Sequence, residues 1–526
     1  MLGAVVATLN SSFAMPSLPN RRSFLKSSAA VAGGLIGLGG LGDFGFLGRL
    51  PRVSAAEAGL DPKFVRFRPE IEPLVRLLEE SPRERVLEEV AGRIQKGTTY
   101  REVLAALLLA GVRNIQPRPV GFKFHAVLVV NSAHLASQNS PDKDRWLPMF
   151  WAVDQFKASQ ARDIKEGNWT MPVVDEGAVP SADQAHRIFG DAMEHWDEAK
   201  ADVAVAGLAR SAGAPEVFDA FCRFGARDFR DIGHKAIYVA NSWRTLQTIG
   251  WQHAEPVLRS LAYALLEHEG ENPAGRDGEP DRPGRQNLER LKKIRPEWLG
   301  GEVSADATKE MLSALRQGTW EQSCDKVVEL LNRKVAPQAV WDALFQHAGE
   351  LLMRKPGIVS LHASTSTNAL HYAWQHTFND ETRRFLLLQN AAFLPMFRAA
   401  AGANEGVKIE DLEPPAGEPQ NAPQAPGLDE VFAEVSGDKA KAARMALAHL
   451  RATGDAAGFI QAAQRLIYLK GTDAHDYKFS SAVLEDYFHA SPGVRDAFLA
   501  SSVYWLKGSG AKESGLVART RAALGG

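Results

Sequence analysis

Four segments of the chain repeat one helical pattern, and this repetition limits the possible folds more than any other feature of the sequence. In each segment an apolar helix is followed by a break and then by a second helix that carries polar groups. Units of this kind stack and bury a shared core. We therefore expect four divergent multi-helix repeats that form an α-solenoid or a closed α-toroid. The second helices align on His125, Asn131 and His134; Lys235, Asn241 and Arg244; His362, Asn368 and His371; and His475, Ser481 and Leu484.

The spacing of apolar residues predicts an all-α protein. They recur at intervals of three and four along most of the chain, and alternating runs typical of strands are scarce. Pro, Gly and charged residues collect between the repeats, most densely in 402–427. We place the repeats at residues 56–165, 166–290, 291–401 and 428–526, with a Pro/Gly-rich linker at 402–427.

The first 55 residues have the pattern of a twin-arginine signal peptide. Arg21 and Arg22 precede a weakly apolar, Gly-rich run from Ala29 to Gly42, and Val53-Ser54-Ala55 is a small-residue cleavage site. The apolar run is too short to span a bilayer. We expect export through the twin-arginine translocation machinery to the periplasm or the extracellular space, with no membrane span in the mature chain. This route carries folded proteins, which suits a cofactor that is inserted before export.

Charge and cysteine content exclude several classes of function. The 61 Lys and Arg residues balance 63 Asp and Glu residues, so the net charge of −2 makes nucleic acid an unexpected partner. Two cysteines, Cys222 and Cys324, allow at most one disulfide, and the sequence leaves open whether they pair. CxxC and CxxCH spacings are absent from the sequence, which argues against a cysteine-bound zinc, iron–sulfur or haem group.

A polar pair recurs in the second helices of three repeats. Each Asn lies three residues before a His or Arg, so the two side chains share one helix face. If these helices line a common interior, the amides and the basic groups converge on a pocket in which a neutral imidazole can act as acid, base or ligand. The alternative is that each pair braces an adjacent loop. The pocket hypothesis involves Asn131, Asn241, Asn368, His134, His371 and Arg244.

Aromatic residues and a second set of histidines accompany these pairs. Trp374 and His376 follow His371 and suggest walls for a flat ring substrate, although such spacing is also typical of a core. Four histidines occupy the same position at the start of the second helix, or a position one residue away. They could present four imidazoles to one metal site, or they could be surface or capping residues. These are His125, His234, His362 and His475.

Two segments resemble the questin oxidase-like family. Gly233-His234-Lys-Ala-Ile237-Tyr238, continuing to Ala262, is similar to its first His-rich segment, and Leu361-His362-Ala-Ser-Thr365-Ser366, with the helix from Arg383, is similar to a later one. The resemblance implies an α-helical oxidoreductase of the Baeyer–Villiger type that takes electrons from a reduced nicotinamide. Only His234 and His362 match the histidines of the family. Tyr238, Asn241 and Arg244 stand where the family has His, Tyr and Glu.

We expect an exported oxidoreductase that acts on an aromatic or quinonoid small molecule. Free nicotinamide is not available outside the cytoplasmic membrane, so the electron donor differs or the scaffold has another use. The alternative is a non-catalytic helical-repeat module that binds a ligand or a protein. The expected catalytic residues are His134, His371, Arg244, His234 and His362; the expected substrate-binding residues are Asn131, Asn241, Asn368, Tyr238, Trp374 and His376; and the candidate metal ligands are His125 and His475.

Overall fold

A computed structural model of the chain describes residues 64–413 and 425–525. These residues belong to the second of two units, Met1–Gly59 and Leu60–Gly526. The predicted signal peptide, residues 1–55, lies outside the described residues, as does part of the predicted linker. The described part is all-helical, which confirms the prediction of an all-α protein, and its extended contacts are two isolated bridges, Phe64 with Pro172 and Glu302 with Val335.

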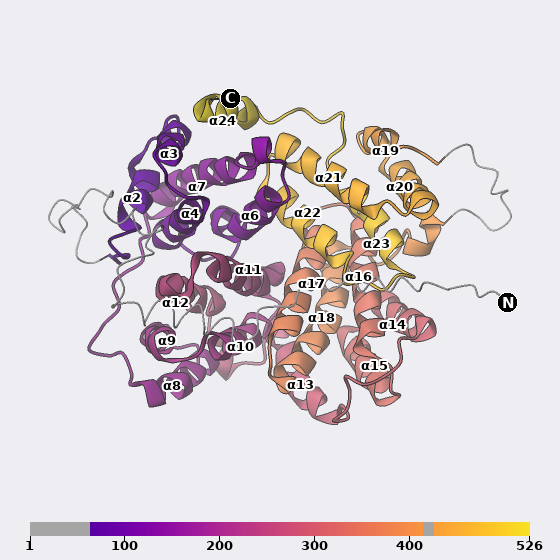
Figure 1. Ribbon diagram of the computed structural model, residues 1–526. Helices are drawn as coiled ribbons and strands as arrows, with labels where there is room; N and C mark the ends of the chain where they lie inside the picture. Colours follow the sequence, from indigo (N-terminus) through magenta and orange to yellow (C-terminus); the bar gives the residue numbers. More distant parts are fainter. Residues whose placement is uncertain (1–63, 414–424, 526) are drawn as a thin grey trace, which may run out of the picture. The chain divides into compact units, whose positions relative to one another are not determined.

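The helices follow one another with short connections (Figure 1). The first predicted repeat contains α2 (Glu72–Glu80), α3 (Val86–Gln95), α4 (Tyr100–Asn114), η1 (Phe122–Phe124), α5 (His125–Leu128), α6 (Val130–Gln138), η2 (Asp142–Asp144) and α7 (Leu147–Glu166). The second contains α8 (Ala182–Glu194), α9 (Glu198–Ser211), α10 (Ala214–Gly225), η3 (Arg230–Gly233), α11 (His234–Ile249), η4 (Trp251–His253), α12 (Ala254–Leu265), η5 (Pro273–Gly275), η6 (Glu279–Asp281) and α13 (Arg282–Arg290).

The third predicted repeat contains η7 (Leu291–Lys293), α14 (Ala305–Gln317), α15 (Trp320–Asn332), α16 (Pro337–Arg354), α17 (Ile358–His376) and α18 (Asp380–Ala401). After η8 (Ile409–Leu412), the fourth contains α19 (Leu428–Glu434), α20 (Lys439–Thr453), α21 (Ala456–Lys470), α22 (Ala474–Asp486), α23 (Arg495–Ser501), η9 (Ser502–Tyr504) and α24 (Gly515–Leu524).

Capping residues explain several of these boundaries. Thr99 and Glu102 form a capping box that starts α4, and Asp473 accepts a backbone hydrogen bond that starts α22. In the first repeat the expected second helix is divided at Val129 into α5 and α6. Val127, Val129 and Val130 are β-branched and weaken a helix at this point.

The second helices of the four predicted repeats pack against one another. Helix α6 contacts α11, α11 contacts α17, α17 contacts α22, and α22 contacts α6. Each also contacts a helix of its own repeat, for example α17 with α16 and α18. We call α5, α6, α11, α17 and α22 the inner helices. All the polar side chains that the sequence singled out lie on them.

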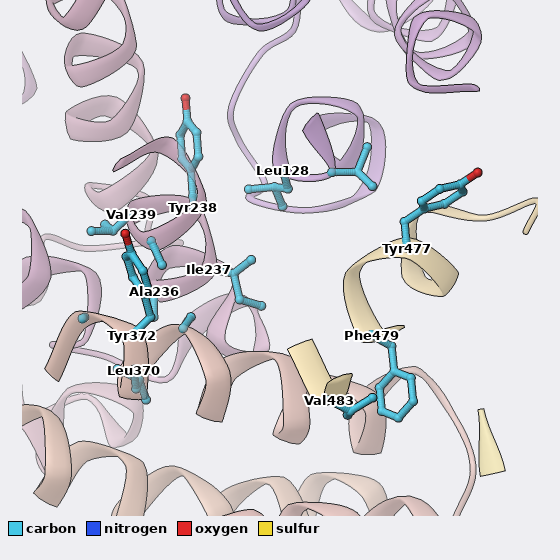
Figure 2. Close-up of a cluster of buried hydrophobic side chains, with 14 of the residues drawn as sticks. Leu128, Ala236, Ile237, Tyr238, Val239, Leu370, Tyr372, Tyr477, Phe479 and Val483 are labelled. Carbon is cyan, nitrogen blue, oxygen red and sulfur yellow. The ribbon is translucent and has the colours of Figure 1, made fainter. Parts of the chain in front are cut away.

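Apolar side chains from α5, α11, α17 and α22 form a buried cluster (Figure 2). Leu128, Ile237, Leu370 and Phe479 come from α5, α11, α17 and α22 and are all buried. Full burial of a side chain of this size contributes about 1.5–3 kcal/mol. This packing fixes the backbone of the inner helices and, with it, the relative positions of the polar residues they carry.

Candidate metal centre

Four imidazoles from four distant segments of the chain lie together at the start of the inner helices. His125 begins α5, His234 begins α11, His475 is the second residue of α22, and His362 lies in the first turns of α17. The ring centroids of His125 and His234 are 4.8 Å apart, and those of His234 and His362 are 4.2 Å apart. The His475 ring lies 4.6 Å from His125 and 5.2 Å from His362. We call this group the imidazole cluster.

Each ring is oriented by a hydrogen bond at Nδ1. The acceptors are the carbonyl oxygens of Phe122 at 2.9 Å for His125, Asp231 at 2.6 Å for His234 and Ile358 at 2.7 Å for His362, and the Asp473 carboxylate at 2.5 Å for His475. A carbonyl oxygen only accepts hydrogen bonds, so Nδ1 of the first three rings carries the proton. In their neutral form these rings therefore present an unprotonated Nε2, which is the arrangement found in metal-binding histidines.

The Nε2 atoms converge on one small space. Those of His125 and His234 are 2.9 Å apart, and ligand nitrogens of His125, His234 and His362 all lie within 4.8 Å of one another. The buried Nε2 of His475 has no hydrogen-bond partner among the described residues. Two facing lone pairs at 2.9 Å repel each other unless a proton or a metal ion lies between them.

The dimensions of the cluster fit a transition-metal ion. With metal–nitrogen bonds of about 2.0–2.1 Å, ligands at right angles are about 2.9 Å apart and opposite ligands about 4.2 Å apart. The His125–His234 separation of 2.9 Å matches the first value, and the limit of 4.8 Å for the set is about 0.6 Å above the second. Imidazole nitrogen is a preferred ligand for zinc, copper, iron and nickel.

A buried lysine shares this space. Nζ of Lys478 lies 3.3 Å from Nε2 of His362 and 3.5 Å from Nε2 of His234. Lys478 is three residues after His475, so both side chains point from the same face of α22. Burial lowers the pKa of Lys478 to about 7, because the charged ammonium is poorly solvated there. The sequence interpretation missed Lys478, although its spacing from His475 was a signal that could have found it.

Burial also favours the neutral form of three rings of the cluster, those of His125, His234 and His362. It lowers the pKa of His125 to about 2, with Lys478 adding to the effect. The pKa values of His234 and His362 fall well below their ordinary value, chiefly through burial and further through the neighbouring basic groups. Neutral imidazoles are the form that binds metal ions.

Strained loops place two of the rings. Asp231 and Ile232, which precede α11, have φ values of 55° and 45°, and Gly233 has φ 79°. A left-handed conformation is a genuine outlier for a β-branched residue such as Ile232, and strain of this kind is concentrated at functional sites. Gly121 has φ 139°, and a Cβ added there would lie 3.2 Å from Cε1 of His234. The two loops are therefore packed tightly around the His234 ring.

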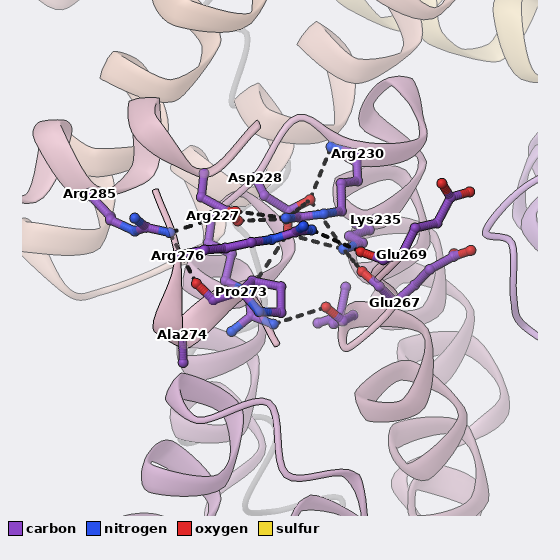
Figure 3. A network of polar contacts seen from close by, with 12 residues as sticks. Arg227, Asp228, Arg230, Lys235, Glu267, Glu269, Pro273, Ala274, Arg276 and Arg285 are labelled. Carbon is purple, nitrogen blue, oxygen red and sulfur yellow. Dashed lines mark hydrogen bonds and ion pairs between the residues drawn. The ribbon is translucent and has the colours of Figure 1, made fainter. Parts of the chain in front are cut away.

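An ion-pair network anchors the same loops (Figure 3). Lys235, the residue after His234, donates to the two Asp228 carboxylate oxygens at 3.1 and 3.0 Å and to the Glu267 carbonyl at 3.0 Å. The Glu267 carboxylate accepts from the backbone N–H of Val120 at 2.8 Å, which ties the loop before His125 to the same group. Burial alone would raise the pKa of Asp228, but Lys235 and its arginine neighbours hold it below the ordinary value.

A second polar group lies further along the inner helices. Arg244 of α11 donates to the Glu485 carboxylate of α22 at 2.7 Å, and its guanidinium lies 3.9 Å above the Tyr372 ring. Asn368 of α17 donates to Glu485 and to Asp486, both at 2.8 Å. Burial and the Glu485 charge raise the pKa of Asp486 well above its ordinary value. We call Arg244, Asn368, Glu485 and Asp486 the ion-pair cluster.

The remaining predicted site residues lie around or beyond the ion-pair cluster. His371 packs among Trp341, Phe345, Trp374 and His489, and burial lowers its pKa well below the ordinary value. His376 stacks on Tyr372 with ring centroids 3.9 Å apart. His134 instead bonds to the Tyr100 hydroxyl at 3.0 Å through Nδ1. The structure therefore gives His134 and His371 different surroundings.

The three repeated asparagines have different partners. Asn241 donates to the Leu128 carbonyl at 2.9 Å, which braces α11 against α5, and Asn368 belongs to the ion-pair cluster. Nδ2 of Asn131 is buried without a partner among the described residues. The Tyr238 hydroxyl donates to Ser260 at 2.8 Å and is buried. The amides thus do not meet around one common partner.

Both cysteines are free and buried, so the pairing question that the sequence left open is answered: Cys222 and Cys324 do not form a disulfide.

A separate buried ion cluster lies on α16. His347 and Glu350, three residues apart on this helix, pair with each other, and Glu350 also pairs with Arg316 and Arg354. Among the helices in the described ranges, none combines the length and apolar character needed to cross a membrane.

Comparisons with known protein families, with curated proteins and with solved structures find no match to this chain.

Proposed function

We propose that this protein is an exported metalloprotein of the oxidoreductase class, in which the imidazole cluster holds one transition-metal ion. The observation that carries this proposal is the convergence of four oriented rings. Three present unprotonated Nε2 atoms to one space, and the fourth has a buried Nε2 without a partner among the described residues. Rings that only capped their helices would have no reason to point into a shared space.

The proposed architecture is a closed α-toroid of four repeats. The contacts between successive inner helices, together with the contact between α22 and α6, support a closed ring rather than an open solenoid. A ring of this kind places the starts of all four second helices at one end of its axis, where each repeat supplies one imidazole. The metal site then arises from the repetition itself.

Several features support an oxidoreductase. Imidazole ligands suit the redox metals copper and iron as well as zinc. The resemblance to questin oxidase-like proteins rests on His234 and His362, which are two members of the cluster. The substrate proposed from the sequence is an aromatic or quinonoid small molecule. In the oxidation of a hydroquinone by dioxygen the substrate itself supplies the electrons, so a reaction of this kind at a redox metal would need no reduced nicotinamide outside the cytoplasm. The twin-arginine route allows the metal to be inserted before export.

The first test is metal binding by the purified full chain. The protein is stripped with a chelator, and binding of Zn²⁺, Cu²⁺ and Fe²⁺ is measured by calorimetry and elemental analysis. We expect one equivalent of a transition metal in the wild type and in His186→Ala, whose histidine is exposed on α8, and loss of that equivalent in His234→Ala. If His186→Ala and His234→Ala bind metal equally, the metalloprotein proposal is wrong, and a non-catalytic helical-repeat module becomes the better interpretation.

The second test concerns the reaction class. The metal-loaded protein is assayed for oxidation of hydroquinones and phenols, with oxygen uptake as the readout. We expect turnover that disappears on chelation and in His234→Ala. If the protein binds metal but shows no metal-dependent oxidation, the proposed metal site is still supported and the proposed oxidoreductase activity is wrong.

A further inference from the structure

The charges around the imidazole cluster are not balanced. Its four ring ligands are neutral when they bind a metal, so a divalent ion would keep its full charge. Lys478 is almost fully buried, and the polar contacts of its Nζ are with the rings of His234 and His362. The carboxylate that bonds to the cluster is Asp473, which already accepts from His475 and whose side chain is 62% exposed.

An uncompensated positive charge inside a protein is costly, and a bound anion would offset it. A carboxylate suits this site because it has two oxygens, one for the metal and one for a lysine ammonium. Lys478 reaches the same space as the Nε2 atoms of His234 and His362, with separations of 3.5 and 3.3 Å, so both positive groups can contact one carboxylate. A bidentate contact of this kind also fixes the orientation of the ligand.

Two exposed apolar residues flank the imidazole cluster through the backbone carbonyls that they supply to it. Phe122 supplies the carbonyl that holds His125, and its side chain is 65% exposed; Ile358 supplies the carbonyl that holds His362, and it is 43% exposed. His125 itself is only half-buried. A ligand that arrives past these residues would place an apolar body beside Phe122 while its charged end meets the metal.

We infer that the imidazole cluster binds a small organic carboxylate with an apolar body, with Lys478 as the charge partner of the carboxylate. This inference rests on the proposed metal site and adds the class of ligand that the site takes. Lys478 is then a specificity-determining residue, because it discriminates an anion from a neutral molecule of the same shape.

The test compares benzoate with benzamide, its neutral isostere, on the metal-loaded full chain. Binding of each is followed by the visible spectrum of the Co²⁺-loaded protein. We expect benzoate to bind at least about 30-fold more tightly than benzamide. In Lys478→Met we expect benzoate affinity to fall about tenfold or more while benzamide affinity is unchanged, and in Lys478→Arg we expect most of the affinity to return.

Two controls separate charge from packing. Lys157→Met removes a lysine whose Nζ donates to the carbonyls of Leu78 and Glu79, and it should leave benzoate binding unchanged. Phe122→Ala should weaken benzoate and benzamide equally, by about threefold, because it removes only apolar contact.

The outcomes distinguish this inference from the proposed function. Failure of the wild type to load Co²⁺ would overturn both. Normal loading with equal affinity for benzoate and benzamide would overturn the carboxylate inference alone. The same conclusion follows if loaded Lys478→Met binds benzoate as tightly as the wild type. If Lys478→Met does not load metal, the carboxylate inference is judged from two other measurements. These are the ratio of benzoate to benzamide affinity in the wild type and the benzoate affinity of Lys478→Arg.

Discussion

At the start of the inner helices four imidazoles and one lysine meet beside the largely exposed carboxylate of Asp473, whereas about two to three turns further along α11, α17 and α22 the ion-pair cluster pairs Arg244 with Glu485. Both regions lie on corresponding segments of the predicted repeats. The ion-pair cluster joins α11, α17 and α22 through its own hydrogen bonds. In the imidazole cluster, Lys478 contacts the Nε2 atoms of His234 and His362, and the buried Nε2 of His475 has no partner among the described residues. We therefore expect the ion-pair cluster to contribute mainly to stability and the imidazole cluster mainly to the proposed metal binding.

The largest effect that tests this comparison is expected in the ion-pair cluster. Arg244→Leu removes the cation and leaves the Glu485 carboxylate without its counter-charge, with the neutral Asn368 amide as its remaining donor among these residues. We expect the free energy of unfolding to fall by about 3 kcal/mol, as measured by urea denaturation, while metal stoichiometry stays the same. Arg187→Leu breaks an exposed pair with Asp191 and should change stability by less than about 0.5 kcal/mol. If folded Arg244→Leu loses its metal, the ion-pair cluster also supports metal binding, and the two regions do not have separate roles.

A substitution in the imidazole cluster is expected to have the opposite pattern of effects, with a large loss of metal affinity and a smaller loss of stability. His362→Ala removes one ring whose Nε2 faces the shared space, and we expect metal affinity to fall at least about 100-fold, from the loss of one metal ligand. Calorimetric titration measures the affinity, and thermal unfolding of the metal-free protein measures the stability. The opposite result would be retained metal affinity together with a loss of stability, in the metal-free state, as large as that of Arg244→Leu. It would show that the imidazole cluster stabilises the fold and does not bind metal.

A third region, the buried ion cluster of Glu350, extends the comparison to pH. Burial opposes ionisation of Glu350, but His347, Arg316 and the surrounding hydrogen bonds hold its pKa at about 2. The folded-state pKa lies below the unfolded value of about 4.5, so the stabilisation is complete above that pH and is lost as the pH falls toward 2. The difference of about 2.5 pKa units corresponds to about 3 kcal/mol.

Denaturation of the wild type and Glu350→Gln between pH 7 and pH 3 measures this contribution. The wild type should be the more stable at neutral pH, and the difference should shrink as the pH falls. A difference that does not change over this range would mean that Glu350 is not ionised in the folded protein.

The smallest expected effect concerns the residue that orients His475. Asp473→Asn keeps a good helix cap but removes the carboxylate charge beside Nδ1 of His475. We expect metal affinity to fall about tenfold with little change in stability. Asp197→Asn alters the equivalent cap of α9, far from the imidazole cluster in sequence, and should leave metal affinity unchanged. If the wild type and Asp473→Asn bind metal with equal affinity, the charge of Asp473 does not help His475 to bind the metal.

The sequence predicts the helices and the equivalence of the four histidines well, because both depend on local spacing. His125 and His475 were candidates for a metal site, and His234 and His362 were singled out by resemblance; the structure brings all four together. Spacing along one helix does not reveal a partner on another, so Lys478 was missed and the role of Glu485 as the partner of Arg244 was not predicted. The division of the second helix at Val129 depends on packing and was not expected either.

The imidazole cluster takes one ring from each quarter of the chain, and the last, His475, lies close to the C-terminus. A fragment that ends before residue 475, or that begins after residue 125, lacks at least one of the four rings. Under the proposed metal site, metal retention would therefore distinguish assembled chains that span residues 125–475 from shorter fragments.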